Sequence, residues 1–203
     1  MQFFRLGNQH SLLLRWPNPW KTRVRIYPEQ IESFEIARDV KRAPIAEVRQ
    51  LGKIPEDDVK HAFAMIIGEP FVPKDWGGEK SDLQTNHVRL EGEPCSAAFI
   101  FKGPGLVGEL HPANLGKRGD QLIRAFDEPV DLVVVQHHAK IANTVVREAE
   151  SLASNPARPR RYCILDGADT VRILKAYQMF PPPPTPRSAE SNPRAKRSAK
   201  PRL

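Results

Sequence analysis

The sequence has no long apolar run and very little cysteine. None of its 203 residues falls in an apolar stretch of roughly 18 residues, so we expect no membrane-spanning helix. Its first residues lack a basic segment followed by an apolar core, which argues against a secretory signal. The two cysteines, Cys95 and Cys163, have no second cysteine or histidine at a metal-binding spacing. We therefore expect no zinc site, and two small buried side chains in a reducing cytoplasm.

Several catalytic patterns are also missing. The loop Gly116-Lys117-Arg118-Gly119 lacks the Walker spacing, so nucleotide hydrolysis is not supported. The run Gly103–Gly108 is too short, and too interrupted by proline, to be a dinucleotide-binding loop. We find no serine nucleophile elbow, no specific cysteine–histidine arrangement and no internal repeat. The chemistry must come from other residues.

Positive charge is concentrated at the two ends of the chain. The sequence has 31 Lys and Arg against 24 Asp and Glu, a net charge of +7. Residues 1–55 carry ten basic and five acidic side chains, 56–180 carry fifteen and eighteen, and 181–203 carry six and one. Basic ends would attract nucleic acid electrostatically. They would equally keep the protein in solution, and the composition leaves both readings open.

Composition also divides the chain into three parts. From Phe180 onward, four consecutive prolines precede a Ser/Ala/Arg/Lys mixture with little to bury, so 181–203 is predicted to be a disordered basic tail. Residues 1–55 hold one short strand signal at Arg23–Tyr27 among scattered prolines, which predicts a small irregular N-terminal segment. Residues 56–180 form the main domain.

Hydrophobic periodicity in the main domain predicts alternating helices and strands. The expected elements are a helix from about residue 56 to Gly68, strands over 81–90 and 94–102, a helix over 120–126, a strand over 131–136, a helix over 139–153, a strand over 161–165 and a last helix capped near Asp166. This order predicts an α/β fold whose mixed sheet combines one antiparallel hairpin with parallel strands, flanked by helices.

Asp82 and Lys102 are the most informative pair of residues. If a turn at Glu91-Gly92-Glu93 joins the two adjacent strands, the Asp82 carboxylate lies close to the Lys102 ammonium. An acid that holds a metal and a lysine that orients water or neutralises charge are what a magnesium-dependent phosphodiesterase needs. An ordinary cross-strand ion pair would use the same two residues. Both interpretations stay open at this point.

The order of elements resembles the restriction-endonuclease-like nucleases, and Tyr162–Leu174 resembles a closing segment of the Mrr-type enzymes. The resemblance covers roughly residues 56–178, with Asp82 and Lys102 matching in type, order and element. It implies a Mg²⁺- or Mn²⁺-dependent endonuclease that acts on DNA. Asp82 would hold the metal, Lys102 would position water, and Gln121 would touch substrate or water. Since such nucleases often pair to cut both strands, a homodimer is a further expectation.

The sequence departs from that family at one position. Alternation along the second strand places Ile100 where the family has its second acid, and isoleucine cannot ligate a metal. Glu79, three residues before Asp82, is the first substitute as metal ligand and catalytic residue, and Glu69 is the second. The alternative to hydrolysis is therefore a non-catalytic module on the same scaffold that binds nucleic acid or assembles with a partner through Pro181–Pro186.

Four more residues are candidates for substrate binding. Lys117 and Arg118 precede a helix and are expected to contact the phosphate backbone. Gln136 and His137 end a buried strand, at the edge where α/β sites gather. A paired histidine at a strand end is also commonly satisfied by its neighbours.

Overall fold

The computed structural model describes residues 4–6, 10–12, 24–73 and 80–185. Its centre is a five-stranded mixed sheet in the order β3-β7-β6-β5-β4, in which β4 is antiparallel to β5 and all other neighbours are parallel. The strands are β3 (Arg25–Ile26), β4 (Leu83–Leu90), β5 (Glu93–Lys102), β6 (Leu132–His137) and β7 (Arg161–Leu165). Two further strands, β1 (Phe4–Leu6) and β2 (His10–Leu12), pair only with each other.

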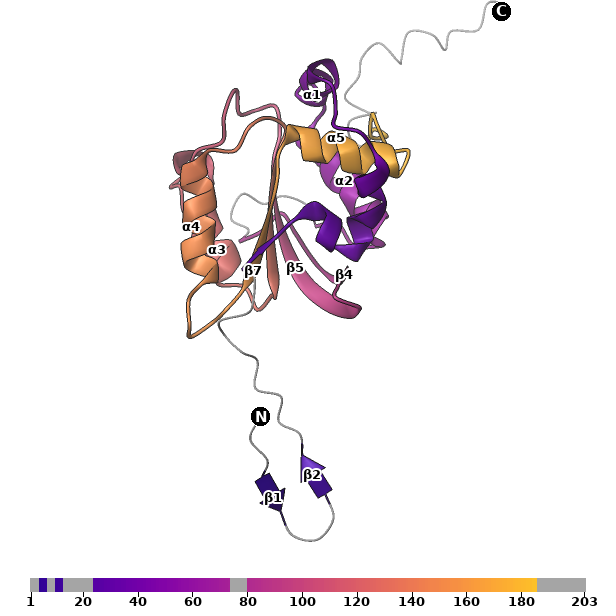
Figure 1. Ribbon diagram of the computed structural model, residues 1–203. Coiled ribbons are helices and arrows are strands. Elements are labelled where there is room, and N and C mark those ends of the chain that lie inside the picture. Colours follow the sequence, from indigo (N-terminus) through magenta and orange to yellow (C-terminus); the bar gives the residue numbers. More distant parts are fainter. Residues whose placement is uncertain (1–3, 7–9, 13–23, 74–79, 186–203) are drawn as a thin grey trace, which may run out of the picture.

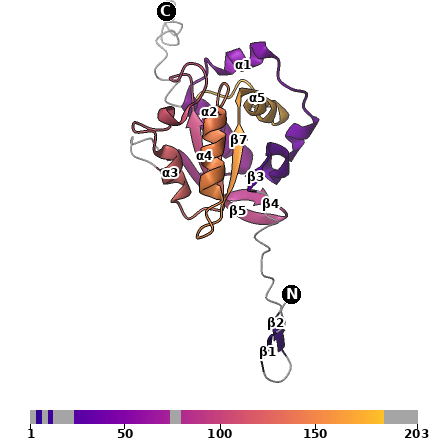
Figure 2. The same cartoon turned by 60° about the vertical axis from the view of Figure 1, so that its left-hand side comes forward.

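Helices cover both faces of the five-stranded sheet (Figures 1 and 2). The α-helices are α1 (Ile45–Leu51), α2 (Glu56–Ile67), α3 (Gln121–Phe126), α4 (Asn143–Ala153) and α5 (Gly167–Ala176), and the 3-10 helices are η1 (Pro28–Gln30), η2 (Glu32–Asp39) and η3 (Pro112–Asn114). The helices α3 and α4 lie on one face, and α2 and α5 lie on the other. The predicted α/β fold with a mixed sheet between helices is confirmed.

Alternation along β5 divides the core into two layers. Phe99 and Phe101 point toward α2, where Phe101 packs edge-on against Phe63 with ring centroids 5.6 Å apart. Ala98 and Ile100 point toward α3 and α4 and are fully buried there. Because side chains alternate along a strand, Lys102 leaves β5 on the α3 side, at the end of the apolar layer.

Both cysteines are buried, as predicted, with free thiols, and they lie in the core layer on the α2 side of the sheet. Burial raises the pKa of the Cys95 thiol to about 11 and raises that of Cys163 further. Both thiols are therefore neutral at physiological pH. In the described part of the chain, no helix combines the length and the apolar character that crossing a bilayer requires.

The described part of the N-terminal segment completes the main sheet. The strand signal at Arg23–Tyr27 is confirmed as β3, which pairs in parallel with β7 at the sheet edge, and η2 packs against α5. At the other end, the predicted tail is described only as far as Thr185, whose buried main-chain N–H donates a 2.8 Å hydrogen bond to Asp58 Oδ1. The rest of that tail, 186–203, lies outside the described residues.

Most predicted boundaries lie within two residues of the observed ones, and the start of α4 differs by more. The helix expected from residue 139 begins at Asn143, because the preceding main chain is bonded to another segment. Leu110 N–H donates to the Lys140 carbonyl, and Ala142 N–H donates to the Leu110 carbonyl, at 2.9 Å each. These bonds hold the connection between β5 and α3, residues 103–120, across the edge where β5, β6 and β7 end. Open α/β sheets bind ligands outside this edge.

Candidate functional site

The structure brings Asp82 and Lys102 together. Asp82 directly precedes β4, Lys102 ends β5, and the Asp82 N–H donates a 2.8 Å hydrogen bond to the Phe99 carbonyl. Lys102 Nζ lies 3.7 Å from Asp82 Oδ2, and the two side chains are 17% and 11% exposed. The distance exceeds that of an ordinary hydrogen bond. The pair therefore faces a common, partly accessible point on the α3 side of the sheet.

Gln121 is the third member of this site. It is the first residue of α3 and only 5% exposed, and its Nε2 donates a 3.1 Å hydrogen bond to Asp82 Oδ1. Phe101 N–H donates a 2.7 Å hydrogen bond to the other oxygen, Asp82 Oδ2. These two bonds fix the orientation of the carboxylate. Within the described residues, the Gln121 Oε1 oxygen is buried and has no hydrogen-bond partner.

Glu56 lies beside the same strand edge and was missed as a site residue. Its Oε2 accepts a 2.6 Å hydrogen bond from Gly103 N–H, just after Lys102. The N–H groups of Phe101 and Gly103 point the same way and are about 7 Å apart in an extended strand. Asp82 and Glu56 therefore cap neighbouring positions of one edge. In the sequence, Glu56 is an acid in the first turn of a helix, where it interacts favourably with the helix dipole. That structural role explained the residue, so it was not considered for the site.

Gly103 allows α2 and β5 to approach this closely. A Cβ atom at this position would lie 2.7 Å from Glu56 Cβ and 3.1 Å from Glu56 Cα. Any side chain there would push the first turn of α2 away from Lys102. The absence of a side chain at Gly103 is therefore a condition for placing the Glu56 carboxylate.

The position of the missing second acid is part of the apolar core. Ile100 is fully buried among Leu110, Leu115 and Leu122. Glu79, the predicted substitute, lies outside the described residues. Glu69, the second choice, accepts a 2.9 Å hydrogen bond from Phe71 N–H and lies 3.9 Å from His87 Nε2. Across the described ranges, no three His, Cys, Asp or Glu side chains gather in a way that could hold a metal.

The predicted phosphate-contacting residues lie on an exposed loop next to this site. Lys117 and Arg118 are exposed and precede α3. A Cβ atom on the neighbouring Gly116 would lie 3.2 Å from Gln121 Cβ, so this loop packs on the first residue of α3. The two cations therefore stand on the surface beside Gln121.

Gln136 and His137 point to opposite faces of the sheet. Gln136 is buried on the α5 side, where its Nε2 donates a 3.1 Å hydrogen bond to Thr170 Oγ1. His137 is fully buried on the other side, with Nδ1 3.0 Å from the Lys102 carbonyl oxygen and Nε2 2.9 Å from that of Gly108. Burial lowers the pKa of the His137 imidazole. Both side chains have protein partners in this structure.

A buried carboxyl, Glu128, lies at the far end of α3. The Ser81 hydroxyl is 3.0 and 2.9 Å from the two Glu128 oxygens, and Ser81 directly precedes Asp82. Burial is the main cause that raises the pKa of Glu128, and the Asp82 charge acts in the same direction. The segment before β4 is thus attached to both ends of α3.

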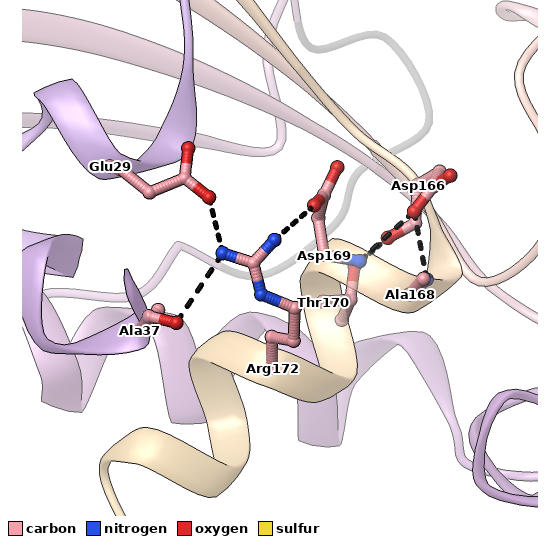
Figure 3. A network of polar contacts seen from close by, with 7 residues as sticks. All are labelled: Glu29, Ala37, Asp166, Ala168, Asp169, Thr170 and Arg172. Carbon is pink, nitrogen blue, oxygen red and sulfur yellow. Dashed lines mark hydrogen bonds and ion pairs between the residues drawn. The ribbon is translucent and has the colours of Figure 1, made fainter. Parts of the chain in front are cut away.

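A second polar cluster surrounds the start of α5 (Figure 3). As predicted, Asp166 caps this helix, and its Oδ1 accepts hydrogen bonds from the N–H groups of Ala168 and Asp169 at 2.8 and 2.9 Å. The Arg172 guanidinium lies 3.4 Å from Asp169 Oδ1, also bonds Glu29 of η1, and donates a 3.3 Å hydrogen bond to a carbonyl of η2. This α5 cluster joins the helix to the N-terminal segment.

The α5 cluster shifts two carboxyl pKa values in opposite directions. Burial, with the nearby Asp166 charge, raises the pKa of Asp169 to about 6. Burial also acts to raise the pKa of Glu29, but hydrogen bonds and the charge of Arg172 outweigh it, so that pKa is lowered. Glu29 is therefore the carboxylate that Arg172 stabilises most clearly.

Comparison with protein-family models, curated proteins and solved structures gives no match.

Proposed function

We propose that this protein is a divalent-metal-dependent phosphodiester hydrolase that acts on nucleic acid, with DNA as the expected substrate. The observation that carries the proposal is the contact between Asp82 and Lys102, at 3.7 Å, beside the end of a parallel strand. Gln121 and Glu56 approach the same end of β5 from two different helices. An acid, an amine and an amide at one partly exposed point suit a phosphodiester with a metal ion.

The residues at this point fit Mg²⁺ or Mn²⁺. Carboxylate oxygens are ligands that hard cations prefer, and Asp82 and Glu56 bring two carboxylates to the end of β5. The partnerless Gln121 Oε1 is a further oxygen of the kind that hard cations prefer, counted among the described residues. Magnesium commonly uses one or two carboxylates together with substrate phosphates. Asp82 and Glu56 would hold the ion, and Glu79 remains a predicted ligand.

Each side chain has a distinct role in the proposed reaction. A bound divalent ion would polarise the phosphoryl group and activate water. Lys102 places a positive charge where negative charge develops in the transition state, and it can orient the attacking water. Gln121 fixes the Asp82 carboxylate through its 3.1 Å hydrogen bond. Lys117 and Arg118 would contact backbone phosphates next to the site.

The test is a cleavage assay on DNA with Mg²⁺ or Mn²⁺. Asp82→Asn keeps the shape and one oxygen acceptor, and Lys102→Met keeps the aliphatic length without the charge. We expect each to lower the cleavage rate by at least about 100-fold, as the loss of an electrostatic catalytic group does. Lys175→Met is the matched control. It removes a lysine of α5 whose Nζ lies 2.8 Å from Glu47 Oε1 of α1, in an ion pair that does not involve the site residues. Cleavage at the unmodified rate in both site variants would remove the assignment.

A non-catalytic nucleic-acid-binding module is the second candidate, and Ile100 is the observation that favours it. A fully buried isoleucine at the expected acid position is consistent with a site that has lost hydrolysis. Such a module would bind DNA with a steep salt dependence and give no metal-dependent product. Removing 186–203, which hold six basic residues and one acidic residue, would then reduce the salt slope.

A further inference from the structure

The connection after Lys102 is fixed to the end of β6 by two consecutive histidines. His138 Nε2 lies 2.9 Å from the Leu106 carbonyl oxygen, and His137 Nε2 lies 2.9 Å from the Gly108 carbonyl oxygen. The main-chain N–H of His138 also donates a 3.2 Å hydrogen bond to the Lys102 carbonyl. Three carbonyls of residues 102–108 are thus held by β6.

The histidine pair is itself well supported. The two rings are in contact, with centroids 4.3 Å apart, and His137 is fully buried. Gly103 O accepts a 3.2 Å hydrogen bond from Leu106 N–H, which closes a turn directly after Lys102. Because this turn and both rings constrain the main chain, the short loop 103–108 has a defined shape.

Val107 is the residue between the two fixed carbonyls. Its side chain is 92% exposed, the largest value among the exposed large hydrophobic residues of the described chain. Apolar side chains stabilise a fold by leaving water, so an exposed valine contributes little to folding. A single exposed aliphatic residue is ordinary on a protein surface. Here the main chain on both sides is fixed, and the loop starts at a site residue.

We propose that Val107 is an apolar wedge that inserts between stacked bases of a nucleic-acid duplex next to the phosphodiester bound at Lys102. This inference rests on the proposed function, since it takes nucleic acid as the substrate. Proteins that deform a duplex use aliphatic side chains in this way, beside cations that hold the phosphates. Lys117 and Arg118 are exposed on the same connection and supply those cations.

The test measures base unstacking without cleavage. The Asp82→Asn protein, without divalent metal, is titrated onto a duplex that contains 2-aminopurine, whose fluorescence rises when it is unstacked. Anisotropy of a labelled duplex reports binding in parallel. We expect a severalfold rise in fluorescence with Val107 present, a reduced rise with the near-isosteric Val107→Thr, and none with Val107→Asp. Binding by Val107→Asp should weaken by about tenfold.

Ile45→Asp is the matched control. Ile45 is 73% exposed on α1, so this variant adds the same negative charge at another exposed apolar position. It should bind and unstack the duplex like the parent protein. Binding by the parent without any rise in fluorescence, or an equal rise in Val107→Asp, overturns the wedge and leaves the hydrolase proposal standing. Absence of binding to any DNA overturns the proposed function itself.

The histidines act as positioning residues in this proposal. His138→Ala removes the hydrogen bond to the Leu106 carbonyl, whereas His138→Gln keeps an N–H donor. We expect His138→Ala to lower the unstacking signal severalfold at saturating protein, and His138→Gln to restore most of it. Equal signals in the alanine and glutamine variants would show that fixing Leu106 does not matter for the wedge.

Discussion

Two polar clusters lie at the same edge of the sheet, and their bonding differs. In the α5 cluster, the Arg172 guanidinium contacts two carboxylates and a carbonyl, and Asp166 accepts two main-chain N–H groups. At the candidate site, Lys102 stays 3.7 Å from its carboxylate, and the buried Gln121 Oε1 has no partner within the described chain. The first arrangement joins segments of the fold. The second leaves one buried amide oxygen, Gln121 Oε1, without a partner among the described residues.

Replacing Arg172 should cause the largest loss of stability among these substitutions. Arg172→Met leaves Glu29 and Asp169 without their cation on the inner side of α5, where the Arg172 side chain is only 18% exposed. We expect a loss of about 2 kcal/mol in the free energy of unfolding, less than for a fully buried pair. Lys102→Met should change the same quantity by less than about 1 kcal/mol. Urea unfolding measures both.

The pair of variants separates a binding site from a structural ion pair. Equal destabilisation by Arg172→Met and Lys102→Met would mean that Lys102 serves the fold as Arg172 does. In that event the contact with Asp82 would be an ordinary cross-strand pair. The cleavage assay and the unfolding assay therefore both test whether Lys102 serves a reaction or the stability of the fold.

The pH dependence of stability should distinguish Asp169 from Glu29 within the α5 cluster. Its folded pKa of about 6 is above its ordinary 3.8, so its contribution to stability is fully present below pH 3.8 and is lost as the pH rises through about 6. Glu29 has a lowered pKa, and its contribution is lost only as the pH falls below about its ordinary 4.5. As the pH rises through about 6, the Asp169 contribution to stability should fall, while the buried His137, whose pKa is lowered, acts in the opposite direction.

Asp169→Asn removes this titration, so the variant should lose less stability, or gain more, than the parent protein as the pH rises through about 6. We expect the change in melting temperature over about one pH unit on either side of that value to be about 2–4 °C more positive in the variant. The matched comparison is Asp131→Asn, because Asp131 forms an exposed bond with Ser96 far from α5. An unchanged slope in Asp169→Asn would place the titrating carboxyl elsewhere.

The smallest expected effect concerns Glu128, at the far end of α3. Its raised pKa means that its ionised form is disfavoured in the folded protein. Glu128→Gln removes the charge and keeps an oxygen that can accept from Ser81, so stability at pH 7 should rise by less than about 1 kcal/mol. DNA cleavage should be unchanged. A large loss of cleavage in a stable Glu128→Gln protein would make this carboxyl part of the reaction.

Local patterns predicted the order of elements and the meeting of Asp82 and Lys102. Alternating residues fix the faces of β4 and β5, and the turn at Glu91-Gly92 has the positive φ values, 57° and 84°, that a tight hairpin uses. These features depend on neighbours in sequence. The predicted contact followed from them because two strands joined by a short turn must pair.

Contacts between distant segments could not be predicted in the same way. Glu56 meets Gly103 across 47 residues, and the hydrogen bond from Gln136 to Thr170 spans 34. The pairing of β3 with β7 depends on how the first residues fold back onto the sheet. The sequence placed His137 at the end of a strand. Its contacts with the carbonyl groups of Lys102 and Gly108 depend on the path of residues 103–110, which local patterns do not predict.

Gly167, the first residue of α5, packs against the main chain that follows β6. Its N–H donates a 3.0 Å hydrogen bond to the Ala139 carbonyl, and a Cβ atom here would lie 2.2 Å from the His138 carbonyl oxygen and 2.8 Å from Val48 Cγ1. One methyl group at residue 167 would therefore act as a spacer between α5 and the end of β6. The strain would fall on the main chain of His138, whose side chain lies next to the Leu106 carbonyl. Backbone clearance at a position that holds no reactive group thus limits how closely α5 and the end of β6 can pack.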